Sequence, residues 1–152
     1  MSAFVSAIIV AAGGSKRMGT SDSKQFIELL GRPVIEYTLR AFQRCGLIKE
    51  IVVVCREQDA PRIKEIAEKN SFTKLSAVVN GGDSRAHSVK NGIAASSPKA
   101  KYFAIHDGAR PLVTREVIEA TIESAKAHGT GVAAVQLKDT VKRVNESGLV
   151  VD

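Results

Sequence analysis

The chain has 152 residues, of which 44% are hydrophobic and 25% charged, and this composition indicates one folded domain rather than a disordered or fibrous chain. Its net charge of +6 and its pI near 9.5 favour anionic partners, such as nucleotides, phosphorylated metabolites or nucleic acid. The lack of Trp leaves few platforms for base stacking, and no segment reaches the ~18 apolar residues of a membrane span, so we expect neither nucleic acid nor a membrane as a partner.

The first third of the chain alternates strand and helix. Residues 5–11 are a continuous apolar run, which predicts a strand covered on both faces. Pro33 suits the first turn of a helix, and Ile35 and Leu39 then share one face of that helix. A second apolar run at residues 50–55 predicts the next strand.

The same alternation continues through the middle of the chain. Apolar residues at helical spacing within 63–67 predict a helix, and the run at 75–79 predicts a third strand. A further apolar stripe predicts the buried face of the next helix, and it consists of Val89, Ile93 and Ala94.

The last part of the body follows the same rule. The run at 102–106 predicts a fourth strand, and Thr114 is the expected N-cap of a helix that Gly129 ends. Residues 131–137 predict a fifth strand. These elements together predict an α/β fold in which a mostly parallel sheet has helices on both faces, with ligands bound beyond the carboxyl ends of the strands.

The C-terminal stretch breaks this alternation. The segments TVKRV and LVVD flank the tetrapeptide NESG and predict a β-hairpin, and Gly148 suits its turn. We therefore divide the chain into a main domain at 1–138 and a protruding β-arm at 139–152. Because an arm of this kind normally returns to a body, we expect that the sequence is truncated after it.

The two cysteines, Cys45 and Cys55, follow a helical pattern and end a strand, respectively. Two thiols cannot complete a four-ligand zinc site by themselves. We interpret both as buried, reduced thiols, which predicts a cytoplasmic protein.

The loop after the first strand, AAGGSKRMGTSDSKQF at residues 11–26, combines glycines with cations. It matches neither the P-loop nor the dinucleotide motif, because Thr20 replaces the P-loop lysine and Ser15 the middle glycine. Turned glycine amides can cradle anions, and Arg17 and Lys24 can stabilise charge on a transferring phosphoryl or nucleotidyl group. A solvated surface turn is the alternative interpretation of this loop taken alone.

Two later loops also follow strands. In NGGDSRAHSVKNG, Asp83 or Ser84 can cap a helix, and Ser88 lies where it could help to read a base or ribose. In HDGARP, Asp107 can hold Mg²⁺ against phosphate oxygens, and Arg110 adds a cation. Three such loops at three strand ends predict a nucleotide-and-metal site.

Four segments resemble a known family in their order and approximate spacing. They resemble the 2-C-methyl-D-erythritol 4-phosphate cytidylyltransferases of non-mevalonate isoprenoid biosynthesis, which have a three-layer, Rossmann-like nucleotidyltransferase fold. The resemblance spans essentially the whole chain, and its segments are AAGGSKRMGTSDSKQF, GGDSRAHSVKNGI, HDGARP and GVAAVQLKDTVKR.

The resemblance implies a reaction between CTP and methylerythritol phosphate with Mg²⁺, which gives the cytidine diphosphate adduct and pyrophosphate. It implies that Arg17 and Lys24 stabilise the transition state and that Asp107 holds Mg²⁺. The residues implied on the nucleotide side are Ala11, Ala12, Gly13, Gly14, Gly82, Asp83, Ser88 and Gly108. Those implied at the second substrate are Arg110, Asp139 and Thr140, the last two reaching a partner subunit through the arm of a homodimer.

The chain departs from the family pattern in places. Ser15 stands where a second loop glycine is common, and Gly108 where alanine is common. Ser23 stands where the family usually has Pro, so we expect Lys24 to lie on a looser loop. If these 152 residues are the whole protein, we expect weak or absent activity and a disturbed dimer.

Three other functions are compatible with these sequence features. Ribitol phosphate cytidylyltransferases share the loops, although the AAGG, ARP and KDTVK segments favour the methylerythritol enzymes. A non-catalytic nucleic-acid-binding domain is a second alternative, which the positive charge suggests and the scarcity of aromatics opposes. A module that binds CTP without turnover is the third.

Overall fold

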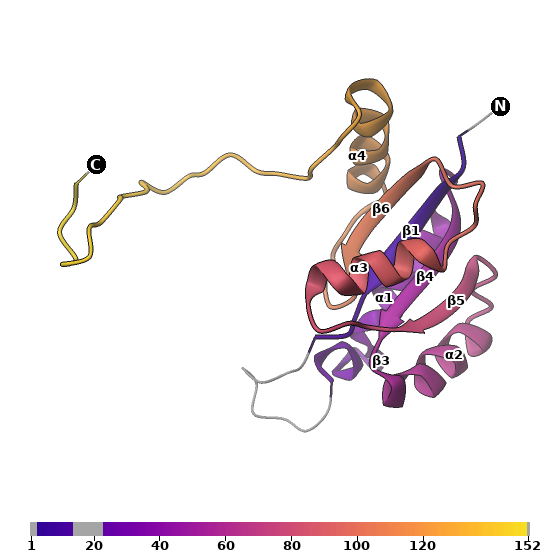
Figure 1. The fold of residues 1–152 in the computed structure, drawn as a ribbon. Helices are drawn as coiled ribbons and strands as arrows, with labels where there is room; N and C mark the ends of the chain where they lie inside the picture. Colours follow the sequence, from indigo (N-terminus) through magenta and orange to yellow (C-terminus); the bar gives the residue numbers. More distant parts are fainter. Residues whose placement is uncertain (1–2, 14–22, 152) are drawn as a thin grey trace.

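The central feature of the computed structural model, which describes residues 3–13 and 23–151, is a four-stranded sheet in the order β5-β4-β1-β6 (Figure 1). All three strand pairs are parallel. Four of the five expected strands are thereby confirmed, and they are β1 (Val5–Val10), β4 (Ile48–Cys55), β5 (Leu75–Asn80) and β6 (Tyr102–Asp107).

Helices cover both faces of this sheet, as expected. One large apolar core joins β1 and β4 to α1, α2 and α4, and a smaller core forms on the opposite face, where α3 lies (Figure 1). The helices are α1 (Val34–Arg44), α2 (Ala60–Lys69), α3 (Arg85–Ala94) and α4 (Arg115–His128). The fold is therefore a three-layer α/β sandwich.

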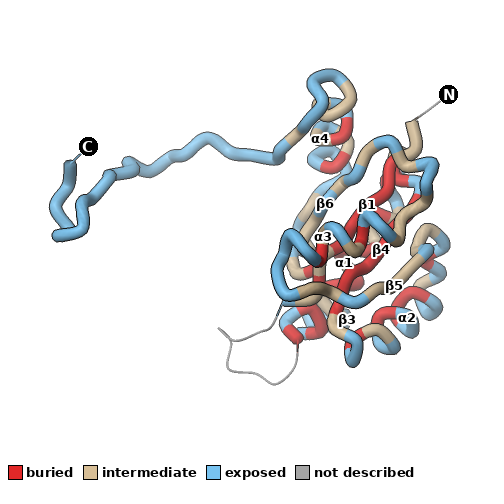
Figure 2. Tube along the Cα trace, in the orientation of Figure 1, coloured by how far each residue is buried: buried red, intermediate tan, exposed pale blue. Residues whose placement is uncertain are grey.

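The continuous apolar runs follow from this layering. On β1, Ala7 and Ile9 face the large core, and Ile8 faces the smaller core with Val52 and Val54 of β4. Successive side chains of a strand point to opposite faces, so a strand covered on both sides needs apolar residues throughout. Figure 2 shows the resulting buried centre of the molecule.

Several local signals act as expected. The Thr114 hydroxyl accepts a hydrogen bond from the Val117 N–H at 3.4 Å at the start of α4, and Gly129 ends that helix with φ +83°. Ser84, rather than Asp83, caps α3, because its hydroxyl accepts a hydrogen bond from the His87 N–H at 3.1 Å.

A small hairpin after the first loop was not foreseen from the sequence. Strands β2 (Glu28–Leu29) and β3 (Arg32–Pro33) pair through a turn at Leu30 and Gly31, whose φ values are +50° and +73°. Two 3₁₀ turns, Lys24–Phe26 and Glu57–Asp59, lie at the beginning of this region and after β4.

The predicted buried face of α3 was wrong. Ile93 and Ala94 are exposed, and Ser88 and Gly92 face the sheet instead. A Cβ at Gly92 would lie 2.5 Å from Ile8 Cγ2 and 2.8 Å from Val54 Cγ2, so the backbone of α3 approaches the sheet too closely for a larger residue.

The fifth expected strand, at 131–137, is also contradicted. These residues extend from the end of α4 as an exposed segment without strand pairing (Figures 1 and 2). A strand needs a neighbour for its backbone hydrogen bonds, and within the described ranges 3–13 and 23–151 none lies beside this segment. The apolar pattern alone could not supply that partner.

Beyond this segment, the expected hairpin is present only at its tip. Val144 and Val150 form an antiparallel bridge around a turn with Gly148 at φ +78°. The Asn145 Oδ1 accepts hydrogen bonds from the N–H groups of Ser147 and Leu149. The longer arm at 139–152 and the domain boundary at 138 stay predictions.

Within the described chain, no helix combines the length and the apolar composition that crossing a membrane requires.

Candidate nucleotide site at the carboxyl edge of the sheet

A cavity of about 510 Å³ lies where the loops after β1, β5 and β6 meet. The strand order explains its position, because the chain moves outward from β1 to β4 and β5 and then returns to place β6 on the other side of β1. Ligands bind at such switch points of parallel sheets. The sequence-predicted residues that line this cavity are Ala11, Ala12, Gly13, Lys24, Gly82, Asp83, Ser88, Asp107 and Arg110.

The first loop reaches the cavity at both of its described ends. The Ala11 N–H donates to the Val54 carbonyl at 2.7 Å, which fixes the exit of β1 against β4. Lys24 returns the chain to the same cavity and its side chain is exposed there. Gly14 and Arg17, two further predicted site residues, lie outside the described residues.

The expected looseness around Lys24 is not found at its described neighbours. Ser23 and Gln25 each have only 1% of their surface exposed, and both side chains are hydrogen-bonded to Asp59. Ser23, which we expected to leave Lys24 on a looser loop, is therefore held by side-chain contacts.

The second loop is packed tightly onto the first. A Cβ at Gly81 would lie 2.3 Å from the Ala12 Cβ, so a glycine is needed for the two loops to meet. The Gly82 N–H donates to the Ser88 Oγ at 3.1 Å, and Ser88 is buried. Ser88 thus holds the loop in place at the wall of the cavity, and Asp83 is exposed beside it.

The third loop places a carboxylate between two guanidinium groups. Asp107 accepts hydrogen bonds from the Arg85 Nη2 at 3.0 Å and from the Arg110 Nε at 2.9 Å. Burial raises the pKa of Asp107, but the hydrogen bonds and charges of the two arginines outweigh it, and the pKa lies below its ordinary value. Asp107 is therefore ionised at neutral pH.

Arg85 is a cavity residue that the sequence reasoning missed. Its position in the chain carried a usable signal, because it directly follows the N-cap Ser84 on a helix that begins at the carboxyl edge. Side chains in the first turn of such a helix face the region where ligands bind.

Gly108 lies beneath the cavity rather than at its surface. It is buried, its N–H donates to the Val10 carbonyl at 2.8 Å, and its carbonyl accepts from the Thr38 Oγ1 at 3.0 Å. A Cβ there would lie 3.0 Å from the Ala11 Cβ, so Gly108 supports the first loop. Its contact with a nucleotide stays a prediction.

Asp139 and Thr140 are not brought to this cavity. Both lie on the exposed C-terminal extension, which leads away from the sheet (Figure 1). Their expected role in a second subunit stays a prediction.

The described residues fit a magnesium ion that is held mainly by a substrate. No group of three or more metal-ligating side chains occurs in the described part of the chain. Mg²⁺ in nucleotide sites commonly takes one or two carboxylates and completes its shell with phosphate oxygens and water. The ionised Asp107 is suited to that arrangement.

The arrangement suits a polyanion near a strand edge. Lys24, Arg85 and Arg110 supply cations, and the glycine loops expose backbone at the cavity wall. The parallel sheet with helices on both faces defines a Rossmann-like α/β protein, a class whose ligands bind at the carboxyl edge of the sheet. The family model of 2-C-methyl-D-erythritol 4-phosphate cytidylyltransferase (IspD) matches residues 5–152, and the chain belongs to that family.

Curated relatives and solved structures agree with this assignment. The chain is 43% identical over 147 residues to 2-C-methyl-D-erythritol 4-phosphate cytidylyltransferase of Alkaliphilus oremlandii, covering 96% of this chain and 62% of the relative. It is 44% identical over 146 residues to the Dehalococcoides mccartyi protein of the same name, covering 96% and 63%. The crystal structure of 4-diphosphocytidyl-2C-methyl-D-erythritol synthase from Anaerococcus prevotii matches with a TM-score of 0.83 and 34% identity, covering 97% of this chain and 62% of that one. The chain therefore spans less than two thirds of the length of these relatives.

Proposed function

We propose that the protein is a nucleotidyltransferase that moves the cytidylyl group of CTP to 2-C-methyl-D-erythritol 4-phosphate. An oxygen of the sugar phosphate attacks the α-phosphorus of CTP, the bond from that phosphorus to the bridging oxygen breaks, and pyrophosphate leaves. The products are 4-diphosphocytidyl-2-C-methyl-D-erythritol and pyrophosphate. One observation carries the proposal: in a chain of this family, three cations and two carboxylates line a cavity at the switch point of the sheet.

The residues have distinct tasks in this proposal. The substrate phosphate is the nucleophile, so the protein supplies positioning and charge stabilisation rather than covalent chemistry. Lys24 lies against the phosphates, together with Arg17, and stabilises the negative charge that develops at the α-phosphorus. Ala11, Ala12, Gly13 and Gly14 provide backbone along the triphosphate, and Gly82, Asp83 and Ser88 contact cytidine.

Asp107 and Arg110 complete the site in this proposal. Asp107 would hold Mg²⁺, which when bound neutralises part of the charge of the triphosphate. Arg110 faces the sugar phosphate, and the low pKa of Asp107 keeps its carboxylate charged at the pH of the reaction.

The decisive experiment is a turnover assay on the protein expressed from its complete reading frame. We expect pyrophosphate release with CTP and methylerythritol phosphate, and much less with ribitol 5-phosphate. In Lys24→Ala, kcat should fall about 100-fold, the typical loss for one charge-stabilising donor. Lys64→Ala removes an exposed lysine of α2 outside the cavity and should leave kcat unchanged. Equal rates in both variants, or no turnover in the wild type, would refute the assignment.

We propose further that the protein works as a homodimer through residues 139–152. The support is that Asp139 and Thr140 are exposed on an extension that reaches away from its own body. Mixing Lys24→Ala with Thr140→Ala protein should restore activity, because hybrid dimers then contain one intact site. A mixture no more active than its parts contradicts shared sites.

We also propose a cytoplasmic location for the protein. Its support is that both cysteines are free and buried. Free thiols persist in a reducing compartment.

A further inference from the structure

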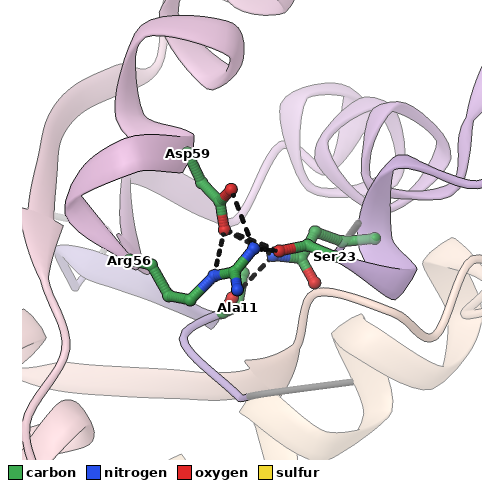
Figure 3. A network of polar contacts seen from close by, with 5 residues as sticks. Ala11, Ser23, Arg56 and Asp59 are labelled. Carbon is green, nitrogen blue, oxygen red and sulfur yellow. Dashed lines mark hydrogen bonds and ion pairs between the residues drawn. The ribbon is translucent and has the colours of Figure 1, made fainter. Parts of the chain in front are cut away.

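A buried polar network holds the segment that carries Lys24. Ser23 and Gln25, the two neighbours of Lys24, are buried, whereas Lys24 is exposed at the cavity. Both neighbours bond to Asp59, which lies in the 3₁₀ turn after β4 and is itself 6% exposed. Figure 3 shows the side chains of Ser23, Arg56 and Asp59 directed at one another beside Ala11.

The donors of this network, on Ser23, Gln25 and Arg56, are paired with acceptors on Asp59 and Ser23. Asp59 Oδ2 accepts from the Ser23 Oγ at 2.8 Å, from the Gln25 Nε2 at 3.3 Å and from the Arg56 Nε at 2.9 Å. The Arg56 Nη2 donates to Asp59 Oδ1 at 3.2 Å and to the Ser23 Oγ. The Ser23 hydroxyl therefore donates once and accepts once.

The network also reaches the end of β1. The Gln25 Nε2 donates to the Ala11 carbonyl at 2.8 Å in addition to its contact with Asp59. A single amide thus connects the cavity residue Ala11 to the carboxylate that holds Ser23. Asp59 is therefore connected to both described ends of the first loop, directly at Ser23 and through Gln25 at Ala11.

These contacts restrict the base of the Lys24 side chain. The Phe26 N–H donates to the Ser23 carbonyl at 2.9 Å, which closes a 3₁₀ turn around Lys24, and Phe26 is buried. Fixing the backbone of a residue costs conformational entropy. In this protein the network meets that cost in the folded state, before a ligand arrives.

We infer that Asp59, with Arg56 as its ion-pair partner, is a positioning residue for Lys24. Neither side chain lines the cavity, so both act through Ser23 and Gln25 rather than by touching substrate. The inference rests on the proposed function only in that Lys24 is taken to act on the transferred cytidylyl group. Displacing a reacting group by about 1 Å can cost about 100-fold in rate, so a loosened lysine should act mainly on kcat.

The first test is a double-mutant cycle of Asp59→Asn with Lys24→Ala, using the turnover assay and thermal unfolding. Asp59→Asn removes the charge that faces Arg56 and should lower kcat about 10- to 100-fold, with KM for either substrate changed less than about threefold. In the Lys24→Ala background it should lower kcat no further, because the residue it positions is gone. Additive losses would show that Asp59 acts independently of Lys24 and would overturn the inference.

Two further variants keep the test decisive if Asp59→Asn unfolds. Ser23→Ala removes one hydroxyl. It should lower kcat with little change in KM, as Asp59→Asn does, but by a smaller factor. Ser23→Pro fits the φ of −70° at this position and restricts the backbone without the hydroxyl, so it should retain a higher kcat than Ser23→Ala. An unchanged kcat in Ser23→Ala refutes positioning, and so does a kcat in Ser23→Pro that is no higher than in Ser23→Ala.

Glu50→Gln is the matched control. Glu50 is another buried carboxylate that accepts hydrogen bonds from serines, but at the opposite edge of the sheet. It should lower the unfolding temperature without lowering kcat below that temperature. If Glu50→Gln and Asp59→Asn lower kcat equally, the Asp59 effect is one of stability only. Wild-type turnover in the same assay reports separately on the proposed function.

Discussion

Two buried carboxylates at opposite edges of one sheet show how the same interaction serves different ends. At the amino edge, Glu50 accepts hydrogen bonds from the hydroxyls of Ser6 and Ser76 and from the Ser97 N–H, the last at 3.0 and 3.2 Å. At the carboxyl edge, Asp59 binds a guanidinium and two polar side chains that flank Lys24.

The two carboxylates differ in whether other contacts would hold their hydrogen-bond partners in place if the carboxylate were removed. The partners of Glu50 belong to β1, β5 and the loop after α3, elements whose positions the apolar cores already determine. Ser23 and Gln25 flank Lys24 in the described end of the first loop, and both side chains are hydrogen-bonded to Asp59, so Asp59 decides where that segment lies. A buried acid among packed elements contributes to stability, and one beside a loop contributes to the geometry of a site.

The largest effect should come from removing the acid at the amino edge. Glu50→Ala leaves two hydroxyls and one N–H without their acceptor, and we expect a loss of about 3 kcal/mol in the free energy of unfolding. Chemical denaturation measures it, and Glu57→Ala at an exposed acid is the control. A loss below about 1 kcal/mol would mean that water or other acceptors replace Glu50 and that the two regions are less alike than their contacts indicate.

Two glycines, one in the smaller core and one at the cavity, test the same difference between stability and site geometry. Gly92→Ala forces a Cβ against Ile8 and Val54 in the smaller core, and we expect a loss of about 2 kcal/mol in stability with CTP affinity unchanged. Gly81→Ala pushes on Ala12 at the cavity, and we expect CTP affinity to fall about tenfold with a smaller loss of stability. Calorimetric titration and denaturation separate the two, and the reverse pattern would contradict this division between core and site.

The smallest effect should be one of pH. Burial raises the pKa of Glu50, but hydrogen bonds from Ser6, the Ser97 N–H and Ser76 outweigh it and leave the pKa below its ordinary value of 4.5. A group with a depressed folded pKa stabilises the protein above its unfolded pKa and loses that contribution as the pH falls through the folded pKa. Wild-type stability should therefore decline below pH 4.5, and Glu50→Gln should decline less. An equal loss of stability on acidification in the wild type and in Glu50→Gln would exclude this role for Glu50.

Features that depend on neighbouring residues in the chain were predictable. Apolar runs predicted β1, β4, β5 and β6, and Thr114 and Gly129 marked the ends of α4. The glycine loops, Lys24, Asp107 and Arg110 were also predicted to meet, because parallel strands bring their carboxyl ends to one edge. Turn chemistry, capping and strand patterning act over a few residues, so the sequence displays them directly.

Predictions of features that depend on contacts between distant residues were wrong. The buried face of α3 was wrong because Gly92 allows a closer approach to the sheet than the apolar stripe at Val89 and Ile93 assumed. The run at 131–137 had the pattern of a strand but no neighbour in the described structure.

The order of strands, helices and loops, and the chemistry available at the site, can be read from the linear chain because each depends on short-range preferences. The alignment of Lys24 cannot, because Ser23 and Asp59 are 36 residues apart and meet only when the turn after β4 closes over the loop after β1. Local patterns specify which groups a segment carries. Packing between segments specifies which of those groups face one another, since burial leaves a polar side chain few partners.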